Sequence, residues 1–235
     1  MLNERDFMDY NNYLRKQAKI DPKFAIKQLC CISDKQIKKC KEIMKEINIK
    51  NVEISKCNNY STKNSLNREK GRLLESLAKL VLESTDLFII HPNIRDHTNE
   101  IDLLITPSDY NKIHSIVLPQ YLREDILVEC KNYDKKIDVN WVGKFSSLIN
   151  THMVKMGIIF SYKEFAGNSE WQSSKGLSKK IFLAEKKAII NINFDDINKI
   201  LNKQMNTVEL IEYKYDALKH HIDYSKLITK HPAEL

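Results

Sequence analysis

The stretch that decides the fold covers residues 125–152 and reads DILVECKNYDKKIDVNWVGKFSSLINTH. Its first part, from Asp125 to Lys131, is short and rich in apolar residues, which predicts a strand. A polar turn follows. From Asp138, a residue type that favours the helix N-cap, apolar residues recur at helical spacing up to His152. We therefore expect a strand, a turn and a helix in direct succession.

Upstream of this stretch, the sequence predicts one long helix and two more strands. Residues 67–84 are amphipathic, and one face carries Leu74, Leu77, Ala78 and Val81. Residues 87–90 and 100–105 are short apolar runs of the strand type. The long gap between the second and third strands contains Pro107 and Pro119 and predicts an extended hairpin insertion.

Downstream, helices and strands alternate. A strand is expected at residues 156–160, a helix at 169–185, a strand at 188–192, and a helix that begins at Asp195 or Asp196. This order of elements predicts an α/β fold with a mixed central sheet flanked by helices.

The chain divides into three predicted parts. Residues 1–65 form a helical N-terminal segment, with helices expected around residues 24–29 and 35–50, residues 66–205 form the α/β domain, and residues 206–235 form a helical tail. The polar, turn-prone stretch at residues 58–65 is interpreted as a linker or exposed loop, which places the boundary there.

Composition narrows the class of protein. The chain has 235 residues and a formal net charge of +7, with a pI near 9.0, which favours polyanionic partners such as nucleic acid or an anionic membrane surface. Five cysteines without a repeated CxxC pair indicate neither a disulfide framework nor a structural zinc site. No signal peptide is recognisable, and no stretch approaches the roughly 20 apolar residues of a membrane span. We expect a cytoplasmic protein.

Four ionisable residues carry the predicted chemistry: Glu75 on the long helix, Asp102 in the second strand, and Glu129 and Lys131 in the third. Side chains two apart on a strand point to the same face, so Glu129 and Lys131 project together while Cys130 points away. By the same alternation, three apolar residues of the second strand are expected on the face opposite Asp102. These are Ile101, Leu103 and Ile105.

Charged groups buried in a sheet need compensation, and a divalent cation would supply it for the carboxylates. Hard oxygen ligands suit magnesium, with manganese as a substitute. We expect Asp102, Glu129 and the backbone carbonyl of Cys130 to ligate the metal, and Glu75 to contact it through a water molecule. Lys131 would position or help to deprotonate an attacking water.

In the order of Glu75, Asp102, Glu129 and Lys131, the chain resembles the PD-(D/E)xK nuclease superfamily, most closely its Mrr-like branch. The similarity covers roughly residues 67 to 195 and includes VECKNYDKKIDVNWVGKF and MGIIFSY. It implies a restriction-endonuclease-like αβββαβ core and a magnesium-dependent endonuclease that hydrolyses phosphodiester bonds in DNA, in restriction or genome defence. It also implies a homodimer, in which two sites would act on opposite strands.

The sequence departs from the family pattern at two points. Ile101 replaces the proline of the motif name, and the gap between Asp102 and Glu129 is longer than the usual hairpin. The second departure leaves open that Glu100 or Asp125 serves in place of one of the expected acidic residues.

Several readings remain open at this stage. The same fold could act on RNA or branched DNA, or serve as a nucleic-acid-binding subunit without activity. Trp141 and Trp171 could stack on bases, although buried packing is more usual. Three lysine pairs, at residues 135–136, 179–180 and 186–187, could contact phosphates, although charge runs usually mark solvated faces.

Overall fold

The computed structural model describes residues 4–21, 24, 30, 32–95, 100–115, 118–168 and 172–220. Its centre is one five-stranded sheet in the order β1-β2-β3-β4-β5. The strands are β1 Phe88–Arg95, β2 Glu100–Pro107, β3 Ile126–Lys131, β4 Met156–Ser161 and β5 Ala188–Ile192. β1, β2 and β3 pair antiparallel, whereas β3, β4 and β5 pair parallel. The predicted mixed sheet is confirmed.

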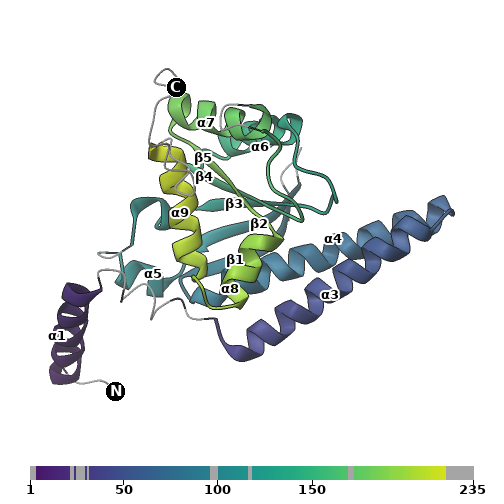
Figure 1. Ribbon diagram of the computed structural model, residues 1–235. Coiled ribbons are helices and arrows are strands. Elements are labelled where there is room, and N and C mark those ends of the chain that lie inside the picture. Colours follow the sequence, from purple (N-terminus) through teal and green to yellow (C-terminus); the bar gives the residue numbers. More distant parts are fainter. Residues whose placement is uncertain are drawn as a thin grey trace, which may run out of the picture.

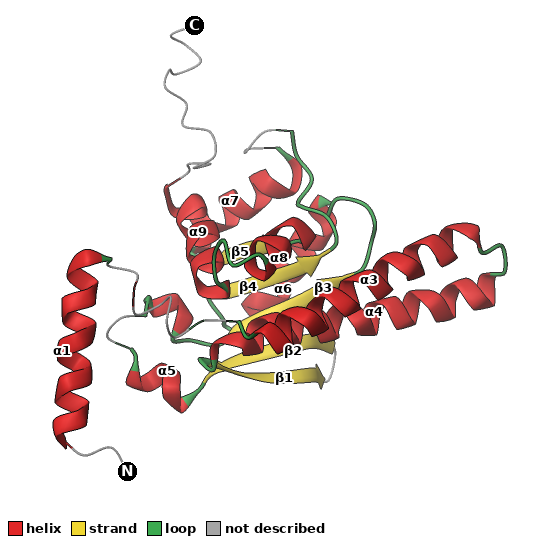
Figure 2. Cartoon of the chain, turned by 60° about the horizontal axis from the view of Figure 1, so that its bottom comes forward, coloured by secondary structure: helices red, strands yellow, loops and turns green. Residues whose placement is uncertain are grey.

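Helices cover both faces of this sheet (Figures 1 and 2). The described α-helices are α1 Glu4–Ile20, α3 Asp34–Lys56, α4 Tyr60–Leu82, α5 Asp109–Ile113, α6 Val139–Thr151, α7 Ser173–Glu185, α8 Phe194–Leu201 and α9 Thr207–His220. One hydrophobic core joins α3, α4, α8 and α9 to the sheet, and a second joins α6 and α7 to its other face. The order α4, β1, β2, β3, α6, β4 is the predicted restriction-endonuclease-like αβββαβ core.

The quoted stretch folds as the sequence predicts. β3 ends at Lys131, and the Asp138 carboxylate caps α6 by accepting hydrogen bonds from the backbone N–H groups of Asn140 and Trp141. The buried side chains of α6 include Val142, Phe145 and Ile149. This capped helix carries the chain across the sheet from β3 to the parallel neighbour β4.

The helices α3 and α4 pack as an antiparallel hairpin whose far end projects beyond the sheet (Figures 1 and 2). The interpretation of residues 58–65 as a linker or loop was wrong from Tyr60 onward, because α4 begins there and continues to Leu82. The Asn59 side chain caps this start by accepting the Thr62 N–H, so a polar, turn-prone sequence became a helix N-terminus. The three-part division of the chain remains a prediction.

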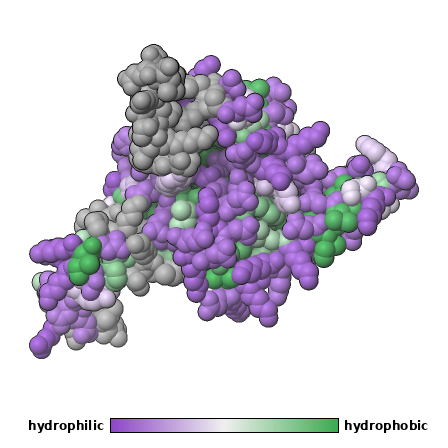
Figure 3. All heavy atoms as spheres, in the orientation of Figure 1, coloured by the Kyte–Doolittle hydropathy of each residue, from purple (hydrophilic) through white to green (hydrophobic). Residues whose placement is uncertain are grey.

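The projecting end of this hairpin, from Lys50 through the turn to Arg68, is called the arm below. Its surface is mostly hydrophilic (Figure 3), and Val52 and Tyr60 are exposed apolar side chains on it. Within α4, the predicted apolar face is correct: Leu74, Leu77, Ala78 and Val81 are all buried. The same helix therefore forms part of the core and part of the arm.

Other predictions met mixed outcomes. The expected hairpin insertion between β2 and β3 contains α5 and a short 3-10 turn at Gln120–Leu122, so it is folded rather than extended. α7 begins at Ser173, and residues 169–171 of the predicted helix lie outside the described residues. So do most of residues 24–29 and all of residues 221–235. Among the helices that the structure describes, none is both long and apolar enough for a membrane span.

Gly157 shows how closely α6 packs on the sheet. A Cβ atom built at this buried β4 position would lie 2.4 Å from Ile149 Cδ1 and 2.6 Å from Phe145 Cε1. Both distances are shorter than any van der Waals separation, so a larger residue at this position would require the Phe145 and Ile149 side chains to move. The absence of a side chain at Gly157 therefore allows α6 to pack closely on β4.

Candidate active site

The candidate site lies where β2 begins and β3 ends, at one edge of the paired strands. The β2–β3 ladder stops at the pair Leu103 and Val128. Beyond it, the Asp102 carboxylate accepts a hydrogen bond from the Cys130 backbone N–H, with an N···O distance of 2.6 Å. A side chain thus replaces the next ladder contact, and the acidic group is held between the two strands.

The β1–β2 hairpin is twisted at the position of Asp102. Asn93, which faces Asp102 across the hairpin, has a positive φ of 52°. Before it, Ile90 packs in the core beneath α3 and α4, whereas Ile94 after it packs on the α6 side. The simple alternation of faces is therefore interrupted at this point in both strands.

This twist corrects one prediction. Leu103 and Ile105 share the α4 side of the sheet, but Ile101 packs on the opposite side with α6 and α7. The three residues do not share one face, because strict alternation holds only while a strand remains regular. The twist leaves Asp102 beside the Cys130 backbone.

Glu129 and Lys131 lie on the same face of β3, as predicted, and form an ion pair with each other. This face is the one that α6 covers. Their side chains are largely buried, with exposed fractions of 17% and 15%. Cys130 points the other way and packs against the core beneath α4. Because charged groups at this burial need partners, the pair forms the polar centre of the site.

Trp141, on the first turns of α6, packs against the lysine. The Lys131 Nζ lies 3.9 Å from the centre of the Trp141 ring, and Lys144 Nζ lies 5.0 Å from it. Both separations are within the range of cation–π contacts. From the sequence, either buried packing or stacking on bases was possible for Trp141. In the structure it is half-buried and is a neighbour of Lys131.

Glu75 approaches from α4, on the other side of the sheet edge. Burial raises the pKa of this carboxyl first, and the negative charges of Asp102, Glu100 and Glu129 raise it further. The Arg72 guanidinium, one turn earlier on α4, acts in the opposite direction. Glu75 is therefore electrostatically coupled to the strand carboxylates, and the four predicted residues form one cluster.

The two strand carboxyls are perturbed in the same direction. Burial is the largest cause of the raised pKa of Asp102, opposed by the Cys130 N–H and by Lys131. Burial also raises the pKa of Glu129, as does the Asp102 charge, against the favourable contact with Lys131. The cluster holds more negative charge than its single lysine compensates.

The structure distinguishes between Glu100 and Asp125, the two alternative acidic residues. Glu100 lines a hollow of about 210 Å³ together with Glu129, Lys131 and Trp141, and its carboxylate pairs with Arg95 at 3.0 Å. Asp125 precedes the first residue of β3, so it lies at the far end of that strand. Glu100 therefore remains a candidate participant, whereas Asp125 does not reach the cluster.

A second hollow, of about 640 Å³, opens on the α4 side of the cluster and is called the arm groove below. Along α4 it is lined by Asn64, Arg68, Arg72 and Glu75, and opposite them by residues 130–133. Arg68 and Arg72 are exposed, and neither forms an ion pair within the described part of the chain. This groove was not predicted from the sequence, because it depends on α4 beginning before Asn67.

The groove is closed at its base by Asn132, which follows the candidate lysine. Its side-chain amide donates a hydrogen bond to the Asn67 carbonyl at 2.9 Å. A Cβ added to Gly71 would lie 3.2 Å from the same amide, so the glycine permits the close approach of the two segments. The end of β3 is thus fastened to α4 beside Glu75.

The donor set fits a hard divalent cation in chemical type. Asp102 Oδ1 accepts no hydrogen bond from the described residues, and both strand carboxyls carry charge that the surroundings leave uncompensated. Within the described ranges, no three Asp, Glu, His or Cys side chains are grouped closely enough to hold an ion by themselves. The predicted ligands are two carboxylate side chains, those of Asp102 and Glu129, and one backbone carbonyl, that of Cys130. They therefore include fewer than three side chains that could ligate a metal directly.

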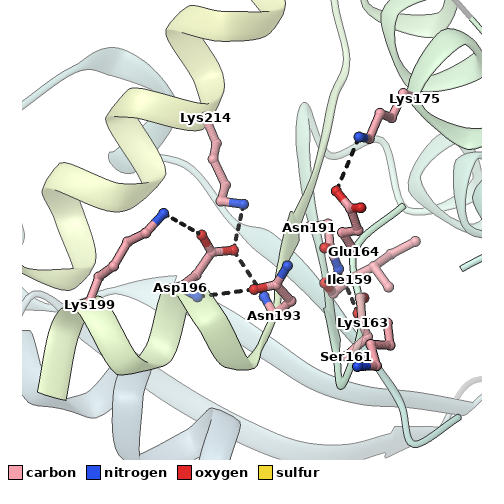
Figure 4. A network of polar contacts seen from close by, with 10 residues as sticks. All are labelled: Ile159, Ser161, Lys163, Glu164, Lys175, Asn191, Asn193, Asp196, Lys199 and Lys214. Atoms are coloured by element: carbon pink, nitrogen blue, oxygen red, sulfur yellow. Dashed lines mark hydrogen bonds and ion pairs between the residues drawn. The ribbon is translucent and has the colours of Figure 1, made fainter. Parts of the chain in front are cut away.

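A polar network that the sequence did not predict lies elsewhere, near the carboxyl end of β5 (Figure 4). Asp196 on α8 is buried and pairs with Lys214 of α9 at 2.6 Å and with Lys199 at 3.6 Å. Its backbone and carboxylate form a capping box with Asn193. These residues line a cavity of about 400 Å³ that shares no lining residue with either hollow beside Lys131.

Comparison with known proteins gives two matches. Residues 67–192 match the family model Mrr_cat, described as restriction endonuclease, and this range contains all four predicted site residues. One similar solved structure is the DNA modification-dependent restriction endonuclease AspBHI, at 12% sequence identity and a TM-score of 0.36. That alignment covers 82% of this chain and 42% of the other, so the chain spans less than half the length of that relative. No curated protein sequence matches.

Proposed function

The chain belongs to the restriction endonuclease family Mrr_cat, and from that premise we propose that it is a metal-dependent endonuclease that hydrolyses phosphodiester bonds in DNA. We further propose that it acts in restriction or genome defence, in the cytoplasm. The observation that carries the proposal is the cluster itself: Asp102, Glu129 and Lys131 meet at the open end of β2 and β3, with Glu75 facing them.

In the proposed mechanism, Asp102, Glu129 and the Cys130 carbonyl would hold Mg²⁺, for which Mn²⁺ could substitute. When bound, the ion supplies charge stabilisation at the scissile phosphate and lowers the pKa of water. Asp102 is already oriented for this role by the Cys130 N–H, while Glu129 is held by Lys131.

The proposed role of Lys131 is to orient the attacking water and to donate hydrogen bonds to the phosphate. Its ammonium has three donors, of which the Glu129 contact uses one. The Trp141 ring limits where the ammonium can move. Glu75 approaches from the opposite side and would accept a hydrogen bond from a water in the site. Lys131 and Glu75 thus bracket the reacting phosphate.

The arm groove would carry the DNA backbone to the site. Arg68 and Arg72 are four residues apart, which corresponds to roughly 6 Å along the helix axis. Both are exposed, and they lie one and two turns before Glu75 on the groove side of α4. Arginine is well suited to bind phosphate through paired donors. In a homodimer, two such grooves would act on opposite strands.

The activity is tested by incubating the protein with supercoiled plasmid and with methylated and unmethylated linear DNA, in Mg²⁺, Mn²⁺ or chelator. We expect metal-dependent cutting that is lost in Lys131→Ala. The matched control is Lys155→Ala, because Lys155 pairs with Glu124 at the opposite end of the parallel strands. If no DNA is cut, or if the two variants cut equally well, the proposal fails; cutting of RNA or branched DNA alone would revise its substrate.

The groove is tested by measuring DNA affinity in the Lys131→Ala background without metal. We expect Arg68→Ala and Arg72→Ala each to weaken binding across sequences and to reduce the slope of log K against log salt by about 1. Arg123→Ala is the control, because Arg123 is exposed and lies outside the groove. Unchanged slopes in both groove variants would contradict the proposed path of the backbone.

A further inference from the structure

The cavity of about 400 Å³ near the end of β5 is a second place where the fold gathers charge. It is formed by β5, α7, α8, α9 and the loop that follows β4, and it contains none of the four predicted catalytic residues. Its volume is in the range of small-molecule sites. The cavity also lies at the carboxyl end of a parallel strand, where open α/β sheets commonly bind ligands.

Four lysines from three helices line this cavity. Lys175 and Lys179 come from α7, Lys199 from α8 and Lys214 from α9. Lys179 is buried, with an exposed fraction of 7%, and the Lys214 side chain is 21% exposed. Lysine is seldom buried to this degree in a protein interior. The four ammonium groups outnumber the three carboxylates that line the same cavity, Glu164, Asp195 and Asp196, so the cavity favours one further negative charge.

Asp196 holds two of these ammonium groups in place (Figure 4). Its carboxylate forms ion pairs with Lys214 at 2.6 Å and with Lys199 at 3.6 Å, and it also accepts a hydrogen bond from the Asn193 N–H. Each ammonium has three donors, and Asp196 is the one carboxylate that Lys214 pairs with in the described structure. Donors therefore remain for a second acceptor beside Asp196.

Burial is the largest influence on Lys214 and lowers its pKa, although the Asp196 charge acts against this. The existing carboxylate thus does not fully compensate the desolvation of the ammonium. A second anion in the cavity would lower the free energy of the charged form. On the α7 side, Lys175 pairs at 3.1 Å with Glu164, which is more exposed than Asp196.

The cavity also has an apolar and aromatic wall, to which Phe165, Ile190, Tyr213 and Leu218 contribute. A phosphate ion alone would leave this wall without a partner, whereas a phosphate attached to a ring system would contact both the wall and the lysines. The geometry points to a nucleoside phosphate as the ligand, and we propose that Lys199 and Lys214 contact its phosphate while Phe165 and Tyr213 pack on its base or sugar.

Equilibrium binding to the full chain, measured by calorimetry without divalent metal, tests this site. The probes are ADP, AMP, inorganic phosphate, adenosine and a short single-stranded oligonucleotide, at constant ionic strength. We expect ADP and AMP to bind more tightly than inorganic phosphate, and adenosine to bind at least about tenfold more weakly than AMP, because a charge-assisted contact is lost.

The variants are Lys199→Gln and Lys175→Gln, whose side chains are 46% and 36% exposed and are thus less important to folding than Lys214. Lys199→Gln is expected to weaken AMP binding about tenfold, because it removes a proposed phosphate contact. Lys175→Gln lowers the positive charge of the cavity without removing such a contact, so it is expected to weaken AMP binding less than Lys199→Gln does. The control Lys155→Gln removes an exposed, ion-paired lysine outside the cavity. The catalytic-site variant Lys131→Ala should bind AMP as the unaltered protein does, which separates this proposal from the nuclease activity.

Four results would overturn the inference. They are the absence of binding by any mononucleotide at millimolar concentration, equal binding of adenosine and AMP, equal effects of the cavity and control variants, and binding of the oligonucleotide alone. Binding of inorganic phosphate as tightly as AMP would also overturn the assignment of the apolar wall.

Discussion

The ammonium of Lys131 lies 3.9 Å from the centre of the Trp141 ring while it pairs with Glu129. Two neighbours of different chemistry thus hold one cation, and the aromatic one is not itself expected to contact DNA during the reaction. This arrangement makes Trp141 a positioning residue for Lys131.

We expect Trp141→Leu to lower kcat by roughly 5- to 30-fold, because the cation–π contact contributes about 1–2 kcal/mol at a site removed from solvent. Trp141→Phe should recover most of the rate, since it retains an aromatic face. The measurement is plasmid cleavage against pH, with KM determined separately. A purely structural role would instead lower Tm in both variants and leave the pH profile unchanged.

Metal binding should be visible without turnover. We expect Mg²⁺ or Mn²⁺ to stabilise the folded protein and so to raise its Tm. At a metal concentration 100 times the Kd, the free energy of unfolding should increase by about 2.7 kcal/mol. Glu129→Gln and Asp102→Asn should abolish the shift, because each removes a proposed ligand. Glu124→Gln is the control, since Glu124 pairs with Lys155 away from the cluster. If metal raised the Tm of Glu129→Gln and Asp102→Asn as much as that of the unaltered protein, these two residues would be excluded as ligands.

The sequence predicted most of this site because strand periodicity places Glu129 and Lys131 on one face whatever surrounds them. It could not predict the hydrogen bond from the Cys130 N–H to Asp102, which exists because the β2–β3 ladder ends at Leu103. Ile101 was misplaced because the irregularity arises at Asn93 on the neighbouring strand, and the sequence of β2 itself carries no sign of it.

The fold, like the site, was predicted only in part. Long periodic helices and apolar strands were recognised, whereas the start of α4 was placed too late because Asn59 and the polar residues after it resemble a turn. The contacts of Asp196 with Lys214 join helices α8 and α9, so only tertiary structure brings them together. For the lysine pair 179–180 the sequence left both phosphate contacts and a solvated face open, and it gave no indication that Lys179 is buried.

The acidic cluster should make stability depend on pH. In the folded, metal-free protein, the pKa values of Glu75, Asp102 and Glu129 are raised, so folding binds extra protons. The stability they contribute is present at low pH and is lost as pH rises from the ordinary carboxyl value of about 4 through the raised values. Removing one carboxylate should therefore relieve repulsion at neutral pH.

We expect Glu75→Gln to be more stable than the unaltered protein at pH 7 by about 1 kcal/mol in chelator, and equally stable near pH 4. Urea unfolding across this pH range provides the measurement. Glu69→Gln, on the same helix but paired with Lys50 at 2.9 Å, should instead lose between 0 and about 1 kcal/mol. A destabilised Glu75→Gln at pH 7 would mean that the cluster is not under repulsion.

Two glycines provide a test of how α6 is seated on the sheet. Gly157→Ala places a Cβ against Phe145 and Ile149, and we expect a loss of about 1–3 kcal/mol in unfolding free energy. Gly143→Ala, on α6 itself, meets nothing closer than Leu177 at 3.9 Å and should gain about 0.5–1 kcal/mol from helix propensity. If Gly157→Ala is as stable as Gly143→Ala, the packing described for β4 and α6 is incorrect.

The continuity of α4 constrains how this protein can change over generations. Arg68 and Glu75 lie on one unbroken helix, so inserting or deleting a single residue between them would rotate the arm by about 100° relative to the cluster. Such a change would turn Arg68 away from the path that leads to Lys131. We expect the lineage of this chain to have altered the arm by exchanging residues in place, and to have tolerated changes in length only at the turn of residues 57–59 or in the loops on the far side of the sheet.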